Sequence, residues 1–190
     1  MYTKTELRNQ VRAMKRAMTE EEILKKSKKI WNNLKRTRAF KEPTCLYMYV
    51  SYNQEVMTIP YIQECMDMGK KIAVPKIVDG RMEFFQITDM TQLEKGYQGI
   101  LEPVSNRVVR GEPGCMLLPG LAFDRKLHRC GYGGGFYDTY LQKYDNGNLK
   151  KIALAYAYQV FEEIPVEQHD KILDAVITEQ EVIGNNSARG

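Results

Sequence analysis

Two stretches near the start of the chain have the hydrophobic spacing of amphipathic helices. Thr3 with Glu6, and Thr19 with Glu22, have the spacing of capping boxes, in which a Thr and a Glu satisfy the first free backbone N–H groups of a helix. The first helical pattern runs to about Met18. The second puts one set of residues on a single face: Ile23, Ser27, Ile30, Trp31 and Leu34. We therefore expect two helices that each bury one face.

Short apolar, β-prone runs farther along predict buried strands over residues 44–50, 71–77, 82–87, 115–118, 151–158 and 174–178. Pro75 cannot donate a ladder hydrogen bond, so it indicates an edge position for the second run. Helices are expected over 58–68, closed by Gly69, and over 136–144. This alternation predicts one α/β domain over residues 1–190, with a mixed, mostly parallel sheet and helices on both of its faces.

The segment from 118 to 141 carries the densest chemical signal. Gly131, Gly133, Gly134 and Gly135 precede the predicted helix at Phe136, so successive backbone N–H groups and the helix N-terminus can face an anion. Arg129, just before them, can bind phosphate oxygens through two donors. A plain flexible turn is the alternative, and the density of glycines beside an arginine favours phosphate binding. In such a sheet ligands sit at the carboxyl ends of strands, where this loop is expected.

Two familiar phosphate-binding motifs do not fit this loop. It lacks the Gly-Lys-Ser/Thr ending of a P-loop. In a dinucleotide fingerprint a third glycine would occupy the place of Phe136, and a strand would precede Gly131, which the sequence does not predict. The loop is therefore expected to bind phosphate in another way.

The first helix has a basic stripe. Lys4, Arg8, Arg12 and Lys15 fall within roughly an 80° sector, beside an apolar sector formed by Leu7, Val11, Met14 and Met18. The spacing leaves two interpretations open, a solvated basic face and a row of cations aimed at an anion. The stripe is also the best argument for nucleic-acid binding, although it lacks interleaved aromatic residues.

Three carboxylates lie at positions where they could bind a ligand or a metal ion. Glu55 follows a predicted strand, although a lone carboxylate there is commonly a surface residue. Asp138 lies in the first turn after the glycines, as a helix-capping residue or as a ligand of Mg²⁺, a hard ion that prefers carboxylate and phosphate oxygens. Asp170 precedes the last predicted strand, as a turn residue or a second ligand.

Composition narrows the class of protein only slightly. The net charge of +4 and the pI of about 8.8 suit polyanionic small molecules or nucleic acid equally. The four cysteines form no Cys-x-x-Cys pair, which argues against structural zinc and for reduced thiols. The first 18 residues lack the apolar core of a signal peptide, and the longest apolar run, at 152–158, is far below the roughly 20 residues of a membrane span. We expect a cytoplasmic protein.

Six segments, in order along the chain, resemble the 5-formyltetrahydrofolate cyclo-ligase family, also called methenyltetrahydrofolate synthetase. They are KTELR (4–8), YVSYNQE (49–55), GKKIAVP (69–75), GILEP (99–103), the stretch 119–141 and the stretch 167–179. RCGYGGGFYD together with the distant EQHD…D…ITE is highly specific, and the six segments span nearly the whole chain.

The resemblance implies roles for particular positions. ATP contacts are implied for Lys4, Arg8, Arg129 and residues 131–137, which are Gly131, Tyr132, Gly133, Gly134, Gly135, Phe136 and Tyr137. Folate contacts are implied for Val50, Glu55 and the stretch from Tyr132 to Phe136, and Mg²⁺ ligation for Asp138 and Asp170. The chain departs from the family pattern at Leu127, where Gly or a polar residue is common, and at Cys130, where Leu is usual. These changes flank the glycines and bear on loop rigidity.

The implied reaction is ATP- and Mg²⁺-dependent closure of 5-formyltetrahydrofolate to 5,10-methenyltetrahydrofolate, with release of ADP and phosphate. A formamide is a poor electrophile, so phosphorylation of the formyl oxygen prepares it for attack by N10. Such transfer needs alignment and charge stabilisation more than a protein nucleophile, with Arg129 and Glu55 as the catalytic candidates. Another ATP-dependent transferase and a basic RNA-binding module remain alternatives. We expect a monomer that binds reduced folate and ATP, without nucleic-acid or membrane partners.

Overall fold

The computed structural model describes residues 3–96, 99–167 and 170–184. Its α-helices are α1 (Lys4–Arg16), α2 (Glu20–Leu34), α3 (Arg38–Lys41), α4 (Ile59–Asp67) and α5 (Phe136–Tyr144). Its strands are β1 (Cys45–Tyr47), β2 (Lys71–Val78), β3 (Arg81–Ile87), β4 (Leu93–Lys95), β5 (Leu101–Pro103), β6 (Val108–Val109), β7 (Gly114–Leu118), β8 (Ala122–Asp124), β9 (Arg129–Cys130), β10 (Leu149–Leu154), β11 (Val160–Phe161), β12 (Ala175–Ile177) and β13 (Val182–Gly184). Single 3₁₀ turns lie at Met90–Gln92 and Ala157–Gln159.

Both predicted capping boxes are present and start their helices. The Thr3 and Thr19 hydroxyls accept from the backbone N–H groups of Glu6 and Glu22, whose carboxylates bind back to the cap residues. α2 buries Ile30, Trp31 and Leu34 of its predicted face against the main sheet. These local signals act over three or four residues, which is why the sequence predicts both helix starts correctly.

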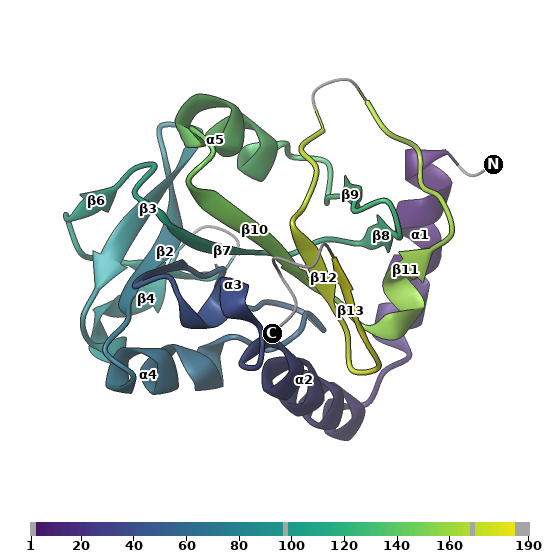
Figure 1. Ribbon diagram of the computed structural model, residues 1–190, viewed down its shortest axis with the longest axis horizontal. Coiled ribbons are helices and arrows are strands. Elements are labelled where there is room, and N and C mark those ends of the chain that lie inside the picture. The colour runs from purple at the N-terminus through teal and green to yellow at the C-terminus, as the bar shows by residue number, and fades with distance from the viewer. Residues whose placement is uncertain (1–2, 97–98, 168–169, 185–190) are drawn as a thin grey trace.

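The main sheet has eight strands in the order β13-β12-β10-β7-β1-β2-β3-β6. β12, β10, β7, β1 and β2 pair in parallel, and β13, β3 and β6 add antiparallel edges. The predicted mixed, mostly parallel sheet is therefore confirmed. A smaller sheet, β11-β8-β9, lies beside α1 (Figure 1).

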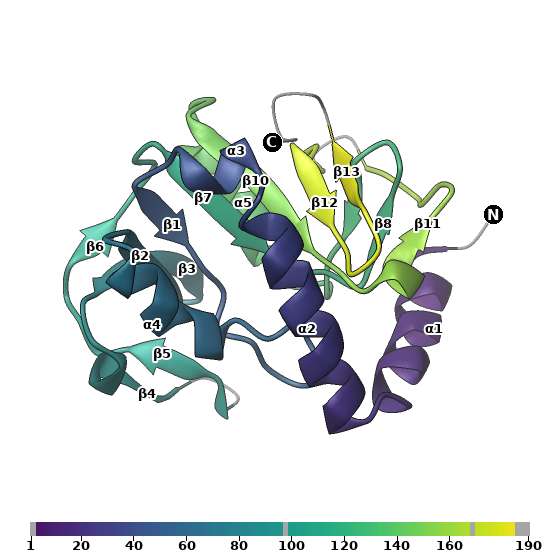
Figure 2. The same ribbon diagram turned by 60° about the horizontal axis from the view of Figure 1, so that its bottom comes forward.

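Helices cover both faces of the main sheet, as predicted. α2, α3 and α4 pack on one face with Leu46 and Leu117, and Figure 2 brings these helices forward of the strands. α5 packs on the other face through Tyr140 and Leu141, against Tyr47 and Met116. The alternation of Leu117 and Met116 between the two cores is the two-residue period of a strand buried on both sides.

The predicted strands over 44–50 and 151–158 are shorter in the structure and end at Tyr47 and Leu154, and two further expectations are wrong. The strand containing Pro75 is internal, between β1 and β3. It tolerates proline because β1 ends at Tyr47, opposite Ala73, so no N–H is required at position 75 on that side. A short strand, β9, also precedes Gly131, paired with β8, although the sequence does not predict one there. Two residues are too few to give a periodic signal.

Candidate active site

The hairpin of β8 and β9 places Arg129 under the glycine loop. The Arg129 side chain is buried, with 5% of its surface exposed. Its guanidinium donates to Asp138 Oδ2 at 2.7 Å and to the Pro119 carbonyl at 3.3 Å, and it lies over the Tyr137 ring. A Cβ at position 131 would come 3.0 Å from Arg129 Nη1, so glycine there leaves room for the guanidinium. The loop and Arg129 therefore form one unit.

The backbone of the loop uses the freedom of glycine at two positions. Gly133 and Gly135 have φ angles of 109° and 66°, a region that other residues rarely adopt. Gly135 is the N-cap of α5, and no side chain among the described residues caps that helix start. The first N–H groups of α5 are thus available to an anion, as the sequence analysis expects of this loop.

Three cations of α1 hold the loop from one side. Arg8 Nε donates to the Gly131 carbonyl at 2.9 Å, and Arg12 Nη2 to the Tyr132 carbonyl at 3.4 Å. Lys15 Nζ donates to the Tyr132 hydroxyl at 3.0 Å. The interpretation of the basic stripe as a merely solvated face is therefore wrong, because the stripe docks onto the loop.

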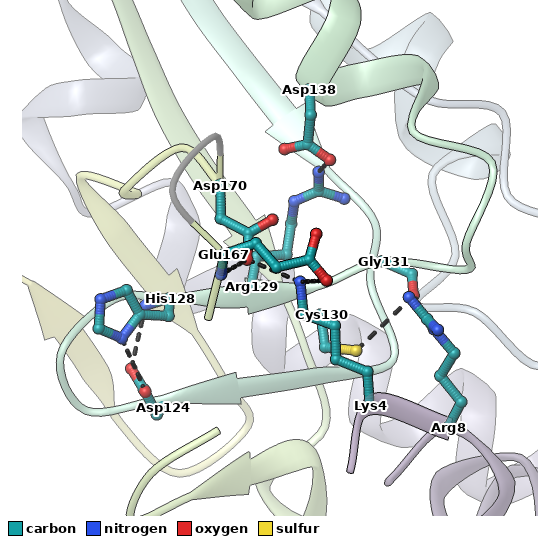
Figure 3. Close-up of polar contacts among 10 residues, drawn as sticks. All are labelled: Lys4, Arg8, Asp124, His128, Arg129, Cys130, Gly131, Asp138, Glu167 and Asp170. Carbon is teal, nitrogen blue, oxygen red and sulfur yellow. Dashed lines mark hydrogen bonds and ion pairs between the residues drawn. The ribbon is translucent and has the colours of Figure 1, made fainter. Parts of the chain in front are cut away.

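Two cation–carboxylate pairs join the residues implied in ATP and Mg²⁺ binding, and Figure 3 shows both around β9. Lys4 Nζ lies 2.8 Å from Asp170 Oδ2 and 3.1 Å from Glu167 Oε1. Arg129 and Asp138 form the other pair. Burial acts to lower the pKa of Lys4, but hydrogen bonds and the negative charges of Asp170 and Glu167 prevail and raise it. Lys4 is therefore fully charged at neutral pH.

The structure distinguishes the purely structural roles considered for Asp138, a helix cap, and for Asp170, a turn residue. Asp138 makes no side-chain capping bond at α5, so its carboxylate serves the pair with Arg129. Asp170 does act in a turn, because its Oδ2 accepts from the Glu167 N–H at 2.7 Å, and it binds Lys4 as well. Both carboxylates thus lie beside cations implied in phosphate binding.

Glu55 binds the same Tyr132 hydroxyl that accepts from Lys15. Its Oε1 accepts from the Tyr132 hydroxyl at 2.6 Å, and its Oε2 accepts from the Tyr52 N–H at 2.8 Å. Burial raises the pKa of Glu55, while the Lys15 charge and these two hydrogen bonds act to lower it. Reciprocal hydrogen bonds between Ser51 and Thr58 fix the base of the loop that carries Glu55. The carboxylate is thus held in place and partly desolvated, unlike a free surface Glu.

Tyrosines surround the Glu55 segment. The Tyr156 hydroxyl donates to the Glu55 carbonyl at 3.0 Å, and the Tyr49 hydroxyl donates to the Val56 carbonyl at 2.7 Å. Burial and the charge of Glu55 raise the pKa of Tyr137. These residues come from the loops after β1 and β10 and from α5, so the carboxyl ends of the parallel strands meet here, as expected for this sheet.

A cavity of about 470 Å³ opens beside Glu55, between its loop and the start of α2. Its lining includes Ser51, Tyr52 and Ile23. Val50, implied in folate contact, is 4% exposed and belongs to the core under this loop. Phe136 is half-buried against the core on the α5 face. The substrate contacts of both residues stay predictions.

The residues that depart from the family pattern lie at the turn of the β8–β9 hairpin and on β9. Leu127 has a φ of 70°, a conformation that glycine or a polar residue adopts more easily, and its side chain is buried against the core. The Cys130 thiol is buried near Arg8, Lys4, Asp170 and Arg129, and burial raises its pKa. Neither residue displaces the glycines.

Sequence reasoning missed some residues of this site. It placed Lys15 on the basic stripe but assigned it no contact with Tyr132 or Glu55. It also gave no role to Tyr156 or Glu167, which reach the site from distant segments. A lysine at the inner border of an amphipathic helix was the available signal for Lys15; nothing local marks the other two.

The comparisons with known proteins agree with one another. The model of the 5-formyltetrahydrofolate cyclo-ligase family matches residues 1–179. A probable 5-formyltetrahydrofolate cyclo-ligase of Schizosaccharomyces pombe is 35% identical over 157 residues, 74% of this chain and 76% of that protein. One of Caenorhabditis elegans is 30% identical over 194 residues, 95% of this chain and 94% of that protein.

Solved structures show the same likeness. The NMR structure of Aquifex aeolicus 5,10-methenyltetrahydrofolate synthetase is 31% identical, with a TM-score of 0.86 over 98% of this chain and 95% of that one. A 5,10-methenyltetrahydrofolate synthetase of Mycoplasma pneumoniae, 20% identical, has the same fold, with a TM-score of 0.75 over 94% and 99% of the two chains. The chain therefore belongs to the 5-formyltetrahydrofolate cyclo-ligase family, a family of ATP-dependent ligases of folate metabolism.

Proposed function

We propose that this site closes 5-formyltetrahydrofolate to 5,10-methenyltetrahydrofolate at the expense of ATP, with Arg129 and Glu55 as its catalytic residues. The observation that carries the assignment of residues is the glycine loop itself. On one side it adjoins cations and a helix start without a side-chain cap among the described residues, and on the other its Tyr132 hydroxyl binds the half-buried Glu55 carboxylate. The proposal takes residues 1–190 as one cyclo-ligase-like domain.

The phosphate side is formed by Lys4, Arg8 and Arg129 with the loop from Gly131 to Tyr137. Arg129 is buried, planar and already oriented by Asp138, so it loses little freedom on binding a phosphate oxygen. The Arg8 guanidinium carbon lies 3.8 Å from where a Cβ of Gly133 would be, so a phosphate bound at the loop would meet that charge. Backbone N–H groups at the start of α5 complete the phosphate contacts.

Mg²⁺ fits this side through Asp138 and Asp170. No cluster of three metal-binding side chains occurs within the described residues. Mg²⁺ bound with a nucleotide needs only one or two carboxylates, however, because phosphate oxygens and water fill its other positions. Each aspartate is now paired with a cation that we assign to phosphate binding. Asp138 and Asp170 would hold the ion beside the cations assigned to phosphate, and the ion would offset the negative charge that develops on transfer.

The folate side is formed by Glu55, Val50 and the stretch from Tyr132 to Phe136. The ionised Glu55 carboxylate accepts from the reduced pteridine and orients the N5–N10 region. With the substrate held there, the formyl oxygen faces the terminal phosphate across the glycine loop. ATP phosphorylates that oxygen and leaves as ADP. N10 then attacks the formyl carbon and gives its proton to solvent, and phosphate departs as the ring closes. Alignment and charge stabilisation carry these steps, so no protein nucleophile is required.

Substrate dependence of ATP hydrolysis tests the proposal against its rivals. ADP should form with 5-formyltetrahydrofolate present and remain at background with tetrahydrofolate. Equal ADP formation in both would favour another ATP-dependent transferase. Affinity for an RNA oligonucleotide that falls steeply as salt rises would instead favour the RNA-binding alternative.

The remaining expectations belong to the same proposal. We take the chain to act as a monomer on small molecules, without a nucleic-acid or membrane partner, in the cytoplasm. In the described part of the chain, no helix has the length and apolar character needed to span a bilayer. Size-exclusion chromatography with light scattering tests the monomer.

A further inference from the structure

Lys15 begins a chain of three polar groups that crosses the site. Its side chain is buried in α1, and Lys15 is 5% exposed. Its Nζ donates to the Tyr132 hydroxyl at 3.0 Å and lies 5.3 Å from the centre of that ring. The same hydroxyl donates to Glu55 Oε1 at 2.6 Å. An ammonium from α1, a phenol from the glycine loop and a carboxylate from the loop after β1 are thus joined in series.

We propose that Lys15 is a positioning residue of the reaction, which through the Tyr132 hydroxyl holds the glycine loop and the Glu55 carboxylate in one arrangement. The inference rests on the folate-binding role proposed for Glu55. It extends that role, because Lys15 itself has no contact with either substrate in this account. It acts on the substrate through Tyr132 and Glu55.

Packing alone gives no reason for a lysine at this place. Leu7 and Val11 already anchor α1 to the small sheet, and an apolar side chain would fill the position without burying an ammonium. In the part of the chain that the structure describes, no carboxylate lies within 4.0 Å of Lys15 Nζ. Burial lowers the pKa of Lys15, so the fold disfavours its charged form. A buried charge kept at such a cost points to function.

The neighbours of Lys15 on α1 do different work. Arg8 and Arg12 bind the carbonyls of Gly131 and Tyr132, which fixes the loop backbone whatever side chain it carries. Of these three cations, Lys15 binds the Tyr132 side chain. The backbone of the loop and the direction of the Tyr132 hydroxyl are therefore held by separate contacts, and a change at Lys15 should affect only the second.

The charge of Lys15 also favours the ionised form of Glu55. Burial raises the pKa of Glu55, and the Lys15 charge is the largest influence that acts to lower it. Among the described residues, the other titratable groups that interact with this carboxylate are uncharged phenols, from Tyr49, Tyr132, Tyr137 and Tyr156, and the cation whose charge acts on Lys15 is Arg12. Loss of the Lys15 charge therefore raises the pKa of Glu55, and Glu55 is protonated at a higher pH than in the parent.

Lys15→Met, Lys15→Arg and the control Arg16→Met, at an exposed cation of the same helix, test the inference. Initial rates of phosphate release are followed from pH 5 to 9 with each substrate varied. Lys15→Met should lower kcat/KM for the folate roughly tenfold, the scale of one hydrogen bond to a charged group, with KM for ATP within about twofold of the parent. The acid limb of its pH profile, that is, the fall in rate at low pH, should move to higher pH. In Lys15→Arg and Arg16→Met the acid limb should stay where it is in the parent.

If Lys15→Met unfolds at a lower temperature than the parent, Tyr132→Phe tests the inference instead. That variant leaves α1 intact and should show the same rise of the acid limb and the same selective loss for the folate. The double variant should lose less than the product of the two single losses, because Lys15 acts through Tyr132. An unmoved acid limb, or equal losses for ATP and the folate, would overturn the inference while the parent's activity still supports the proposed function. A parent that releases no phosphate would overturn the proposed function first.

Discussion

The two sides of the glycine loop solve the problem of buried charge in different ways. On the phosphate side every assigned carboxylate is within 2.8 Å of a cation, in the pairs Lys4–Asp170 and Arg129–Asp138. On the folate side Lys15 and Glu55 are joined through a phenol, and burial lowers the pKa of Lys15 and raises that of Glu55. The first side is a set of exchangeable ion pairs, suited to a polyanion. The second holds one carboxylate by desolvation and hydrogen bonds, suited to orienting a neutral ring.

This difference predicts which variable each side responds to. Substitutions on the phosphate side should change the use of ATP and Mg²⁺ and leave the acid limb of the pH profile in place. Substitutions on the folate side should move that limb. Each of the following substitutions alters one side of the loop and should therefore change only the variable assigned to that side.

Arg129→Ala should have the largest effect. It removes a charge-assisted phosphate contact worth about 1.5–3 kcal/mol, so kcat/KM for ATP should fall about 10- to 150-fold. Arg125→Ala is the matched control, because Arg125 pairs with Glu181 on the surface, where such pairs contribute little. An unchanged kcat/KM for ATP in Arg129→Ala would remove Arg129 from the phosphate side.

Glu55→Gln should act on the other substrate. The amide keeps the shape of the side chain but loses the charge, so kcat/KM for the folate should fall about tenfold or more. Burial raises the pKa of Glu55 above its ordinary value of 4.5, so the parent loses activity as the pH falls through that raised pKa. Glu55→Gln should lack this loss. A parental acid limb in the variant would assign the titration to another group.

Asp138→Asn and Asp170→Asn test the metal assignment. Asn is close to Asp in shape but is a much poorer Mg²⁺ ligand, so each variant should need about tenfold more Mg²⁺ for half-maximal rate. Asp145→Asn, which breaks a pair with Lys151 away from the loop, is the control. If both variants melt normally and keep the parent's Mg²⁺ dependence, the two aspartates do not hold the ion.

Leu127→Gly should have the smallest effect on catalysis. Glycine relieves the left-handed backbone at position 127, worth about 1–3 kcal/mol, but empties a buried site whose loss costs about 2–5 kcal/mol. We expect a net loss of stability of about 1–2 kcal/mol, with kcat/KM for both substrates near parental at low temperature. A more stable variant would show that backbone strain outweighs burial there.

The sequence predicts the parts of this molecule that depend on neighbours in the chain. The bounds of α5 and the starts of α1 and α2 follow from caps, glycines and periodicity within a few residues. Strand lengths do not follow in this way. β1 ends at Tyr47 rather than at 50, because its end is set by partners on β2 and β7.

The same distinction between local and long-range contacts applies to the candidate site. The glycine loop and Arg129 are recognisable because they lie within one segment. The contact of Lys15 with Tyr132 joins residues 117 positions apart, and that of Tyr132 with Glu55 joins residues 77 apart. Neither spacing carries a local signal, so only the packing of α1 and the sheet reveals them. Glu55 resembles a surface carboxylate until its hydrogen bonds with Tyr52 and Tyr132 are known.

The most direct test of the whole account is the absorbance of the methenyl product when the purified chain is mixed with 5-formyltetrahydrofolate, ATP and Mg²⁺. Product should appear with all three components present and should be absent when any one is left out. Full activity without ATP, or no product with every component present at neutral pH, would contradict it.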